Sequence, residues 1–260
     1  MLKLSAVIIT YNEENNIERC LRSLRQVADE IVIVDSFSSD RTVEICKKYG
    51  AKIYERRWQG YSHTKNFGNQ MAAYNQILSI DADEVLSPEL EASILHMKAN
   101  SLPGIYSFNR KTNYCGKWIH HCGWYPDVKI RFFDRTFARW EGEYVHEELS
   151  FKRSLAVRHL KGDLLHYSFE SLGDHLQRVN KYSDLAASEL LERDKGGAGF
   201  RMVFSPLSKF LKLYFLKKGF LDGFYGFCIC AISAFDVLIR YAKVIHLRRS
   251  MEQAKDKPGG

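Results

Sequence analysis

Two aspartates separated by one residue follow an apolar segment near residue 80, and this arrangement could bind a metal ion. The apolar segment is Ile77-Leu78-Ser79-Ile80, and the triplet after it is Asp81-Ala82-Asp83. Two carboxylates just past a buried strand can turn toward one divalent cation, because hard cations take oxygen ligands and commonly share them with the phosphates of a substrate. The same triplet also occurs in surface turns, so the segments around it decide its meaning.

The first hundred residues alternate short apolar runs with segments of helical spacing, and these elements must position the aspartates. Four strands are expected, at residues 4–9, 31–34, 51–54 and 76–80. Continuous apolar, β-branched runs are typical of parallel strands that are buried on both faces. Helices are expected between them, with Asp40 capping the second and residues 62–74 forming the third, and Ser87-Pro88 is typical of a helix start. The alternation predicts an α/β fold with a mostly parallel sheet.

Polar segments follow three of the expected strands at their carboxyl ends. They are residues 10–13, 35–40 and 81–84. In open α/β sheets, ligands bind beyond the carboxyl ends of the strands, where such segments meet on one edge. Together with the aspartate pair, these segments predict a site for a nucleotide sugar.

The pattern changes after residue 104. A loop rich in aromatic residues, at 114–126, could cover an acceptor while Lys117, Lys129 and Arg131 meet acceptor phosphates; a packed loop is the alternative. Helical spacing dominates the chain after the last expected strand. We therefore expect a domain over residues 1–195, with a nucleotide-sugar half at 1–100 and an acceptor half at 101–170, and a C-terminal helical region over residues 196–260.

The C-terminal segment, residues 203–245, is apolar and aromatic with scattered lysines and arginines. Residues 219–239 have the length of a transmembrane helix, but Asp222 and Asp236 argue against one because each is costly in hydrocarbon. Two amphipathic helices on the cytosolic face of a membrane fit better, with their basic residues facing lipid head groups. Packing on the main domain or on a second subunit is the alternative.

Composition and charge limit which partners and which cellular compartment are expected. The 260-residue chain has a formal net charge of +7, which suggests anionic partners: nucleic acid, an acidic membrane or phosphorylated substrates. Its six cysteines include no C-x-x-C pair, which favours free thiols in a reducing compartment. The first residues lead directly into a strand, without the pattern of a signal peptide. We expect a cytoplasmic protein that is peripheral on the inner face of the cytoplasmic membrane, and a homo-oligomer is compatible with the sequence.

Three segments resemble the signature series of the inverting family 2 glycosyltransferases. They are residues 7–13, 33–40 and 78–84, and the resemblance covers the first hundred residues strongly. Residues 140–149 and the C-terminal segment are similar to a narrower group, the enzymes that extend lipopolysaccharide core oligosaccharide. The resemblance implies a GT-A fold, a nucleotide-diphosphate sugar donor, here a UDP-sugar, and transfer of one sugar to a lipopolysaccharide core or other lipid-linked acceptor.

The resemblance also implies which residues bind the donor. Contacts to the nucleotide sugar fall on Thr10, Tyr11, Glu13, Asp35, Ser38, Lys65, Asp81, Ala82 and Asp83. Asp35 would accept a hydrogen bond from the base ring N–H, which favours uracil, and Lys65 would reach a phosphate unless it lies on a solvated helix face. Asp81 would contact the ribose or the metal shell. Asp83 would bind Mn²⁺ or Mg²⁺, with His166 as a further ligand.

Inverting transfer needs a carboxylate that takes the proton of the acceptor hydroxyl. Glu147 is the candidate base by its place in the family series, Glu148 is the rival, and His146 could orient the base. If this stretch is extended, Glu147 shares a face with Val145 and Leu149, and Glu148 lies on the other face. An ordinary pair of solvated glutamates is the alternative.

Other function classes fit less well. A nucleotidyltransferase also binds nucleotides on an α/β sheet with acidic metal ligands, but residues 11–14 are acidic where its Gly-rich, basic loop is expected. A membrane-bound nucleotide-sugar binding module without turnover is the non-enzymatic alternative, and the candidate base weighs against it. Nucleic-acid binding is weaker still, because the positive charge lies beside the apolar runs of the tail and no nucleic-acid motif is present.

Overall fold

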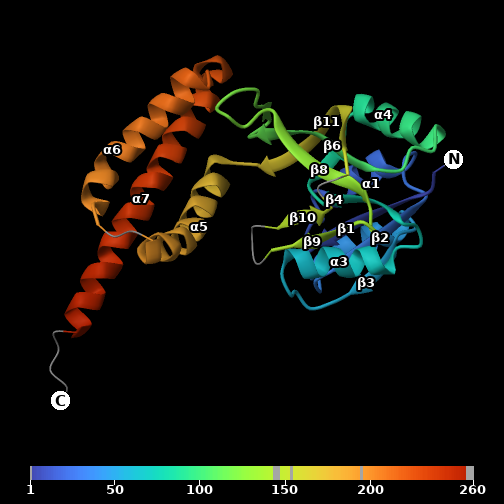
Figure 1. The fold of residues 1–260 in the computed structure, drawn as a ribbon, viewed down its shortest axis with the longest axis horizontal. Helices are drawn as coiled ribbons and strands as arrows, with labels where there is room; N and C mark the ends of the chain where they lie inside the picture. Colours follow the sequence, from blue (N-terminus) through green and yellow to red (C-terminus); the bar gives the residue numbers. More distant parts are fainter. Residues whose placement is uncertain (1, 143–146, 153–154, 194–195, 256–260) are drawn as a thin grey trace. The chain divides into compact units, whose positions relative to one another are not determined.

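The computed structural model describes residues 2–142, 147–152, 155–193 and 196–255 (Figure 1). The chain forms two compact units, which we call the sheet unit and the helical unit. The sheet unit contains Met1–Lys111 and Pro126–Tyr167, and the helical unit contains Thr112–Tyr125 and Ser168–Gly260. Each unit has an apolar core of its own.

Four parallel strands form one half of the sheet. They are β1 (Leu4–Thr10), β2 (Glu30–Asp35), β3 (Lys52–Glu55) and β4 (Gln76–Asp81), and they lie in the order β3-β2-β1-β4. The four strands expected from the sequence are therefore confirmed. In the register, Thr10 lies beside Asp35 and Ile9 lies beside Asp81. The carboxyl ends of β1, β2 and β4 thus meet at one edge.

The other half of the sheet brings later parts of the chain to that edge. It contains β5 (Glu84–Leu86), β6 (Ile105–Tyr114), β7 (Lys117–Trp118), β8 (Asp127–Asp134) and β11 (Val157–Phe169). The order continues from β4 as β8-β6-β11-β5, and β8 is antiparallel to β4. Strand β5 pairs with β11 so that His166 lies beside Glu84. His166 therefore lies near the aspartate triplet.

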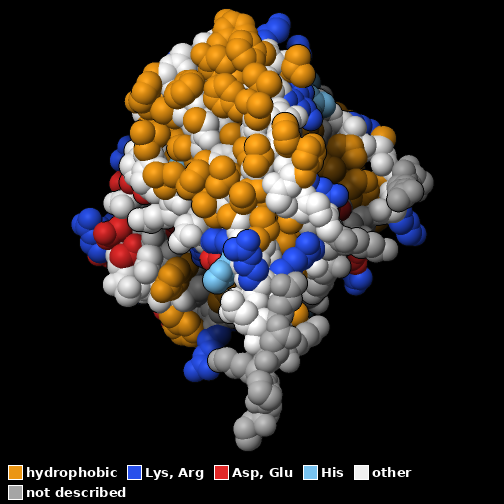
Figure 2. All heavy atoms as spheres, turned by 90° about the vertical axis from the view of Figure 1, so that its left-hand side faces the viewer, with side chains coloured by type: hydrophobic (Ala, Val, Ile, Leu, Met, Phe, Trp, Pro, Cys, Tyr) orange, Lys and Arg blue, Asp and Glu red, His pale blue; other side chains and the backbone are white. Residues whose placement is uncertain are grey.

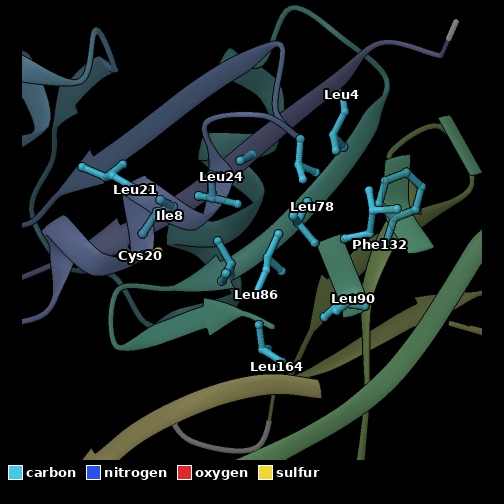
Figure 3. Close-up of a cluster of buried hydrophobic side chains, with 14 of the residues drawn as sticks. Leu4, Ile8, Cys20, Leu21, Leu24, Leu78, Leu86, Leu90, Phe132 and Leu164 are labelled. Atoms are coloured by element: carbon cyan, nitrogen blue, oxygen red, sulfur yellow. The ribbon is translucent and has the colours of Figure 1, made fainter. Parts of the chain in front are cut away.

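Helices cover both faces of the parallel half (Figure 1). They are α1 (Ile17–Leu24), α2 (Thr42–Lys48), α3 (Tyr61–Met71) and α4 (Pro88–Ala99). Figure 3 shows the core between α1, α4 and the sheet, where Ile8, Leu21 and Leu78 are fully buried. Val7 and Ile77 point to the opposite face of the sheet, which packs against α3. The predicted α/β class is confirmed.

Helix ends agree only partly with the sequence predictions. The hydroxyl of Ser87 accepts a hydrogen bond from the Leu90 N–H and caps α4, as predicted. The predicted capping contact of Asp40 is present, because its carboxylate accepts the Thr42 N–H, although Arg41 is the residue that directly precedes α2. Asp40 lies one residue earlier, and its carboxylate accepts the N–H of Thr42 and that of Glu14. It therefore joins the start of α2 to the loop after β1.

Helix α3 approaches the sheet closely at Gly68. A Cβ atom at this position would lie 2.5 Å from Val7 Cγ1 and 3.0 Å from Val34 Cγ2. Two residues earlier, Asn66 holds a small second sheet, formed by β9 (Ala138–Glu141) and β10 (Glu148–Phe151). Its side-chain amide donates to the carbonyl of Trp140 at 2.8 Å and accepts the Trp140 N–H at 3.0 Å. These contacts fix β9 over α3.

The helical unit consists of three helices and an irregular turn. Its elements are α5 (Leu172–Arg193), α6 (Ala198–Leu211), the π-helical turn η1 (Lys212–Leu216), the 3₁₀ turn η2 (Gly219–Asp222) and α7 (Gly223–Lys255). The aromatic loop is packed here: Tyr114 and Cys122 are buried against Leu213 and Ile229. The predicted C-terminal helical extension is confirmed. Within the described part of the chain, no helix combines the length and the apolar character that crossing a membrane requires.

Candidate active site

A buried carboxylate, Asp35, organises the loops at the ends of β1 and β2. Its oxygens accept hydrogen bonds from the Thr10 hydroxyl at 2.8 Å, the Ser38 N–H at 2.7 Å and the Ser38 hydroxyl at 2.6 Å. An ionised carboxylate has about four acceptor positions. Described residues of the protein thus occupy three of them, and one acceptor position of this fully buried carboxylate is left over.

Two aromatic side chains stand exposed beside this carboxylate. Tyr11 follows β1 and Phe37 follows β2, and both are exposed. The loops that carry them are locked together, because Asn12 N–H donates to the Ser38 hydroxyl and the Asn12 side chain accepts the Ser39 N–H. Phe37 has a φ of +61°, a conformation that is rare for a bulky residue and often marks a functional loop. Sequence reasoning missed Phe37, although an aromatic residue in a Ser-rich loop after a strand was a usable signal.

A buried ionic cluster lies under the end of β4. Lys65 Nζ lies 3.1 Å from Asp81 Oδ1 and 3.2 Å from Glu147 Oε1, and only 2 % of the Lys65 side chain is exposed. Arg131 Nη2 lies 2.7 Å from the second oxygen of Asp81 and 3.6 Å from Glu84. The indole of Trp140 lies next to both cations, 4.9 Å from Lys65 Nζ. The solvated position considered for Lys65 is therefore wrong, and Arg131 does not lie on a surface that could meet acceptor phosphates.

The cations of this cluster keep Asp81 ionised. Burial raises the pKa of Asp81, but the charges of Arg131 and Lys65 outweigh burial and hold it well below the ordinary value. Burial lowers the pKa of Arg131, and Asp81, Glu84 and Glu147 more than reverse this effect. Both oxygens of Asp81 are thus engaged by buried cations of the protein.

Asp83 lies in a different environment from Asp81. Its Oδ2 is 3.2 Å from His166 Nε2, and both side chains are partly exposed. The other ring nitrogen of His166 is buried and has no hydrogen-bond partner among the described residues. Among the residues that the structure describes, no group of three His, Cys, Asp or Glu side chains could hold a metal ion. The Asp83–His166 pair thus offers two groups of the kinds that bind divalent cations, fewer than a complete protein site requires.

Acidic groups concentrate around this pair. Burial raises the pKa of Glu13, a hydrogen bond from Asn16 lowers it, and the charges of Asp83, Asp40 and Asp81 raise it further. Glu13 therefore senses a negative potential at this edge of the sheet.

The two candidate bases lie in different places. The Glu147 side chain is 18 % exposed and forms an ion pair with Lys65, so it belongs to the ionic cluster. Glu148 is exposed and lies opposite Glu141 in the small sheet. Val145 and His146 lie outside the described residues. The role of Glu147 as base stays a prediction, and its position is the one that adjoins Asp81.

Comparison with known proteins gives consistent results. Residues 5–163 match the family model described as Glycosyl transferase family 2. The chain is 32 % identical over 257 residues to an uncharacterized glycosyltransferase of Rickettsia typhi, covering 95 % of this chain and 88 % of that protein. It is 30 % identical over 255 residues to the lipopolysaccharide core biosynthesis glycosyltransferase LpsC of Rhizobium meliloti, covering 94 % and 92 %. Among solved structures, residues 1–349 of S. aureus TarS superpose with a TM-score of 0.47 at 16 % identity, covering 96 % and 92 %.

Proposed function

The chain belongs to glycosyl transferase family 2, and we propose that it moves one sugar, with inversion, from a UDP-sugar to a lipopolysaccharide core or other lipid-linked saccharide. That it is a glycosyltransferase follows from the family, as its sequence resemblance predicted. The observation that carries the finer proposal is the clustering of three features in one unit. A carboxylate with spare acceptor capacity, an Asp–His pair and a glutamate held by a buried lysine all follow the same sheet edge.

The nucleotide would bind at the ends of β1 and β2. Asp35 would accept the N–H of a uracil ring in its remaining acceptor position, since Thr10 and Ser38 occupy the others. Tyr11 and Phe37 would contact the faces of the base, because exposed rings gain from stacking on a base. A cytosine presents an unprotonated ring nitrogen at the corresponding position and would lose this hydrogen bond.

The diphosphate would lie beside Asp83 and His166, which would hold Mn²⁺ or Mg²⁺. When bound, the ion would neutralise the negative charge that develops on the departing diphosphate. Asp81 would have an indirect role and would not bind the ion, because Lys65 and Arg131 engage its oxygens. Its fixed negative charge would keep both cations in place beneath the reacting sugar.

Glu147 would be the general base. It would take the proton of the acceptor hydroxyl, whose oxygen then bonds to the anomeric carbon while the bond from that carbon to the diphosphate oxygen breaks. The ion pair with Lys65 would hold the carboxylate in one orientation. In-line attack at a single centre would invert the configuration of the sugar.

The lipopolysaccharide link rests on the likeness to LpsC over nearly the whole of both chains. A lipid-linked acceptor would place the protein at the inner face of the cytoplasmic membrane. A cytoplasmic, peripheral location agrees with the basic, apolar C-terminal segment.

Two measurements test the proposal. In the first, UDP is titrated into the protein in a calorimeter with and without Mn²⁺, for the natural chain and for Asp83→Ala. We expect binding that strengthens with Mn²⁺ and loses this dependence in the variant. Binding that ignores the metal in both proteins would contradict the role of Asp83, and preference for another nucleotide would contradict the UDP assignment.

The second measurement compares Glu147→Gln with Glu148→Gln, which differ by one position along the chain. We expect Glu147→Gln to bind UDP normally and to transfer sugar at least about a hundredfold more slowly, the typical contribution of a positioned base. Glu148→Gln should keep full activity. The reverse result would identify Glu148 as the base, and UDP binding without transfer by the natural chain would favour a binding module.

A further inference from the structure

The hairpin of α6 and α7 exposes large apolar side chains to an unusual extent. Leu216 is 77 % exposed and Phe224 is 66 % exposed. Others on the hairpin include Phe200, Val203, Phe204, Leu207, Leu211, Phe215, Phe220, Leu221, Phe227, Phe235 and Leu238. Figure 2 shows hydrophobic side chains gathered over this part of the molecule, with Lys and Arg side chains at the margins. Soluble monomers rarely expose contiguous apolar patches of this kind without a partner.

The exposed side chains of α6, the turn and the start of α7 form one continuous face, which we call the hairpin face. On α6 they recur every three to four residues, so they share one side of the helix. At the turn, the Tyr214 ring contacts the rings of Phe215, Phe220 and Phe227, with centroids 5.2, 6.2 and 6.0 Å apart. These contacts carry the apolar face from η1 across the turn and onto the start of α7.

The turn is held rigidly, so its apolar exposure is not the result of a loose end. Gly226 packs on the carbonyl of Gly219 so closely that a Cβ atom would overlap it. Asp222 is buried and accepts the N–H groups of His120 and His121 at 3.3 and 2.8 Å. Lys117 Nζ donates to the Asp222 carbonyl at 2.8 Å. The aromatic loop thus clamps the turn that presents Leu216 and its neighbours.

The charge around the hairpin face is positive. Residues 196–251 contain two acidic residues, Asp222 and Asp236. Asp222 is buried in the clamp, and Asp236 forms an ion pair with Arg240. The exposed basic residues nearest the turn are Lys209, Lys212, Lys217 and Lys218. A ligand for this surface must therefore offer an apolar interior and an anionic rim.

We propose that the hairpin face docks onto a membrane that contains anionic lipids. The apolar side chains around Leu216 enter the boundary between head groups and acyl chains, and the lysines contact lipid phosphates. A second copy of this chain is a poorer occupant, because a two-fold interface would bring together two surfaces with the same positive charge. The inference specifies the contact surface for the membrane location proposed above, and it does not depend on the catalytic roles of any residue.

Vesicle flotation with the purified full chain tests this surface without any sugar donor. The probes are phosphatidylcholine vesicles with and without phosphatidylglycerol. We expect binding that is much stronger to the anionic vesicles and that weakens with salt. Phe215→Ser should lower the vesicle partition coefficient about tenfold, as loss of one buried aromatic side chain implies.

A matched control lies in the sheet unit. Phe137 is 56 % exposed and Phe215 is 54 % exposed, so Phe137→Ser removes a similar exposed ring and should leave binding unchanged. The double variant Lys212→Gln with Lys217→Gln should lower binding to anionic vesicles on the order of tenfold. It removes no apolar side chain, so it tests the electrostatic part even if Phe215→Ser folds poorly.

Several outcomes would overturn the inference. They are no binding to either vesicle, equal binding to neutral and anionic vesicles, or an equal loss in Phe137→Ser. Sedimentation velocity tests whether a second copy covers this face. The face would be assigned to self-association if the protein is a dimer, does not bind vesicles and becomes a monomer in Phe215→Ser. Vesicle binding needs no sugar donor. A negative vesicle result therefore does not affect the test of UDP binding, and a negative result for UDP binding does not affect the vesicle test.

Discussion

Replacing Lys65 with methionine should reveal how strongly the buried ionic cluster depends on its lysine. Lys65 bridges Asp81 and Glu147 at 3.1 and 3.2 Å and is almost fully buried. Methionine keeps most of the side-chain volume and removes the charge. Asp81 would keep Arg131, at 2.7 Å, whereas Glu147 would lose its ion-pair partner. The change therefore separates the charge of Lys65 from its packing.

The size of the effect follows from burial. Removing one partner of a fully buried ion pair costs about 3–5 kcal/mol. Here the side chains of Asp81 and Glu147 are 28 % and 18 % exposed, so water relieves part of the penalty. We expect Lys65→Met to lower the free energy of unfolding of the sheet unit by about 2 kcal/mol.

A double-mutant cycle with Glu147→Gln measures the contact itself. The single and double variants are compared by urea unfolding, and we expect a coupling energy of about 1 kcal/mol between positions 65 and 147. Lys98 supplies the control, because it is another buried lysine of the same unit, bound to Asp29 Oδ2 at 2.7 Å and to the Val27 carbonyl. Lys98→Met should destabilise the protein but add to Glu147→Gln without coupling. Coupling below about 0.3 kcal/mol for Lys65, or equal coupling for Lys98, would refute the reasoning.

Three further predictions concern other parts of the molecule. Burial lowers the pKa of His175 from 6.5 to about 4. Between these values the unfolded chain binds a proton that the folded helical unit does not. The free energy of unfolding, which is at its full value above pH 6.5, should therefore fall by about 2 kcal/mol at pH 5. Thermal unfolding at pH 7 and 5 measures this loss, and His175→Gln should largely remove the pH dependence. Gly68→Ala should cost about 1–3 kcal/mol in urea unfolding, because its Cβ would meet Val7 and Val34; an unchanged midpoint would contradict the close packing of α3. Phe37→Gly should weaken calorimetric UDP binding about tenfold without lowering the melting temperature, since the ring is exposed and glycine accepts its positive φ; unchanged affinity would remove Phe37 from the nucleotide site.

The fold was predictable where one segment's own pattern decides its structure. Buried parallel strands read as apolar, β-branched runs, and β1 to β4 follow these runs closely. The start of α4 was also predictable, because Ser87 and Pro88 are sufficient as a local signal. The role of Asp40 was only partly predictable, because its carboxylate serves two elements, the start of α2 and the loop after β1. A helix cap that is predicted from one segment of the sequence gives no information about a second hydrogen-bond partner in another loop, here Glu14.

The candidate site was predictable only in part, for a related reason. The register of parallel strands brings Thr10 beside Asp35, so their proximity follows from the sheet alone. The partners of Lys65 do not, because Glu147 lies 82 residues further along the chain and reaches it only through the small sheet held by Asn66. A lysine on a helix surface is ordinarily solvated. Only a fold that supplies two carboxylates and an indole ring makes its burial favourable.

This arrangement also separates the two aspartates that the sequence presents as equals. Asp81 lies where Lys65 and Arg131 engage both of its oxygens, so a further cation there would have to displace or face two positive charges. Asp83 is two residues on, has no lysine or arginine among its described ion pairs, and lies beside a histidine nitrogen that binds metals when neutral. A divalent ion would therefore meet repulsion at Asp81 and available ligands at Asp83. In the site that we propose, the buried cations would thus favour Asp83 for the ion and leave Asp81 to hold the protein around it.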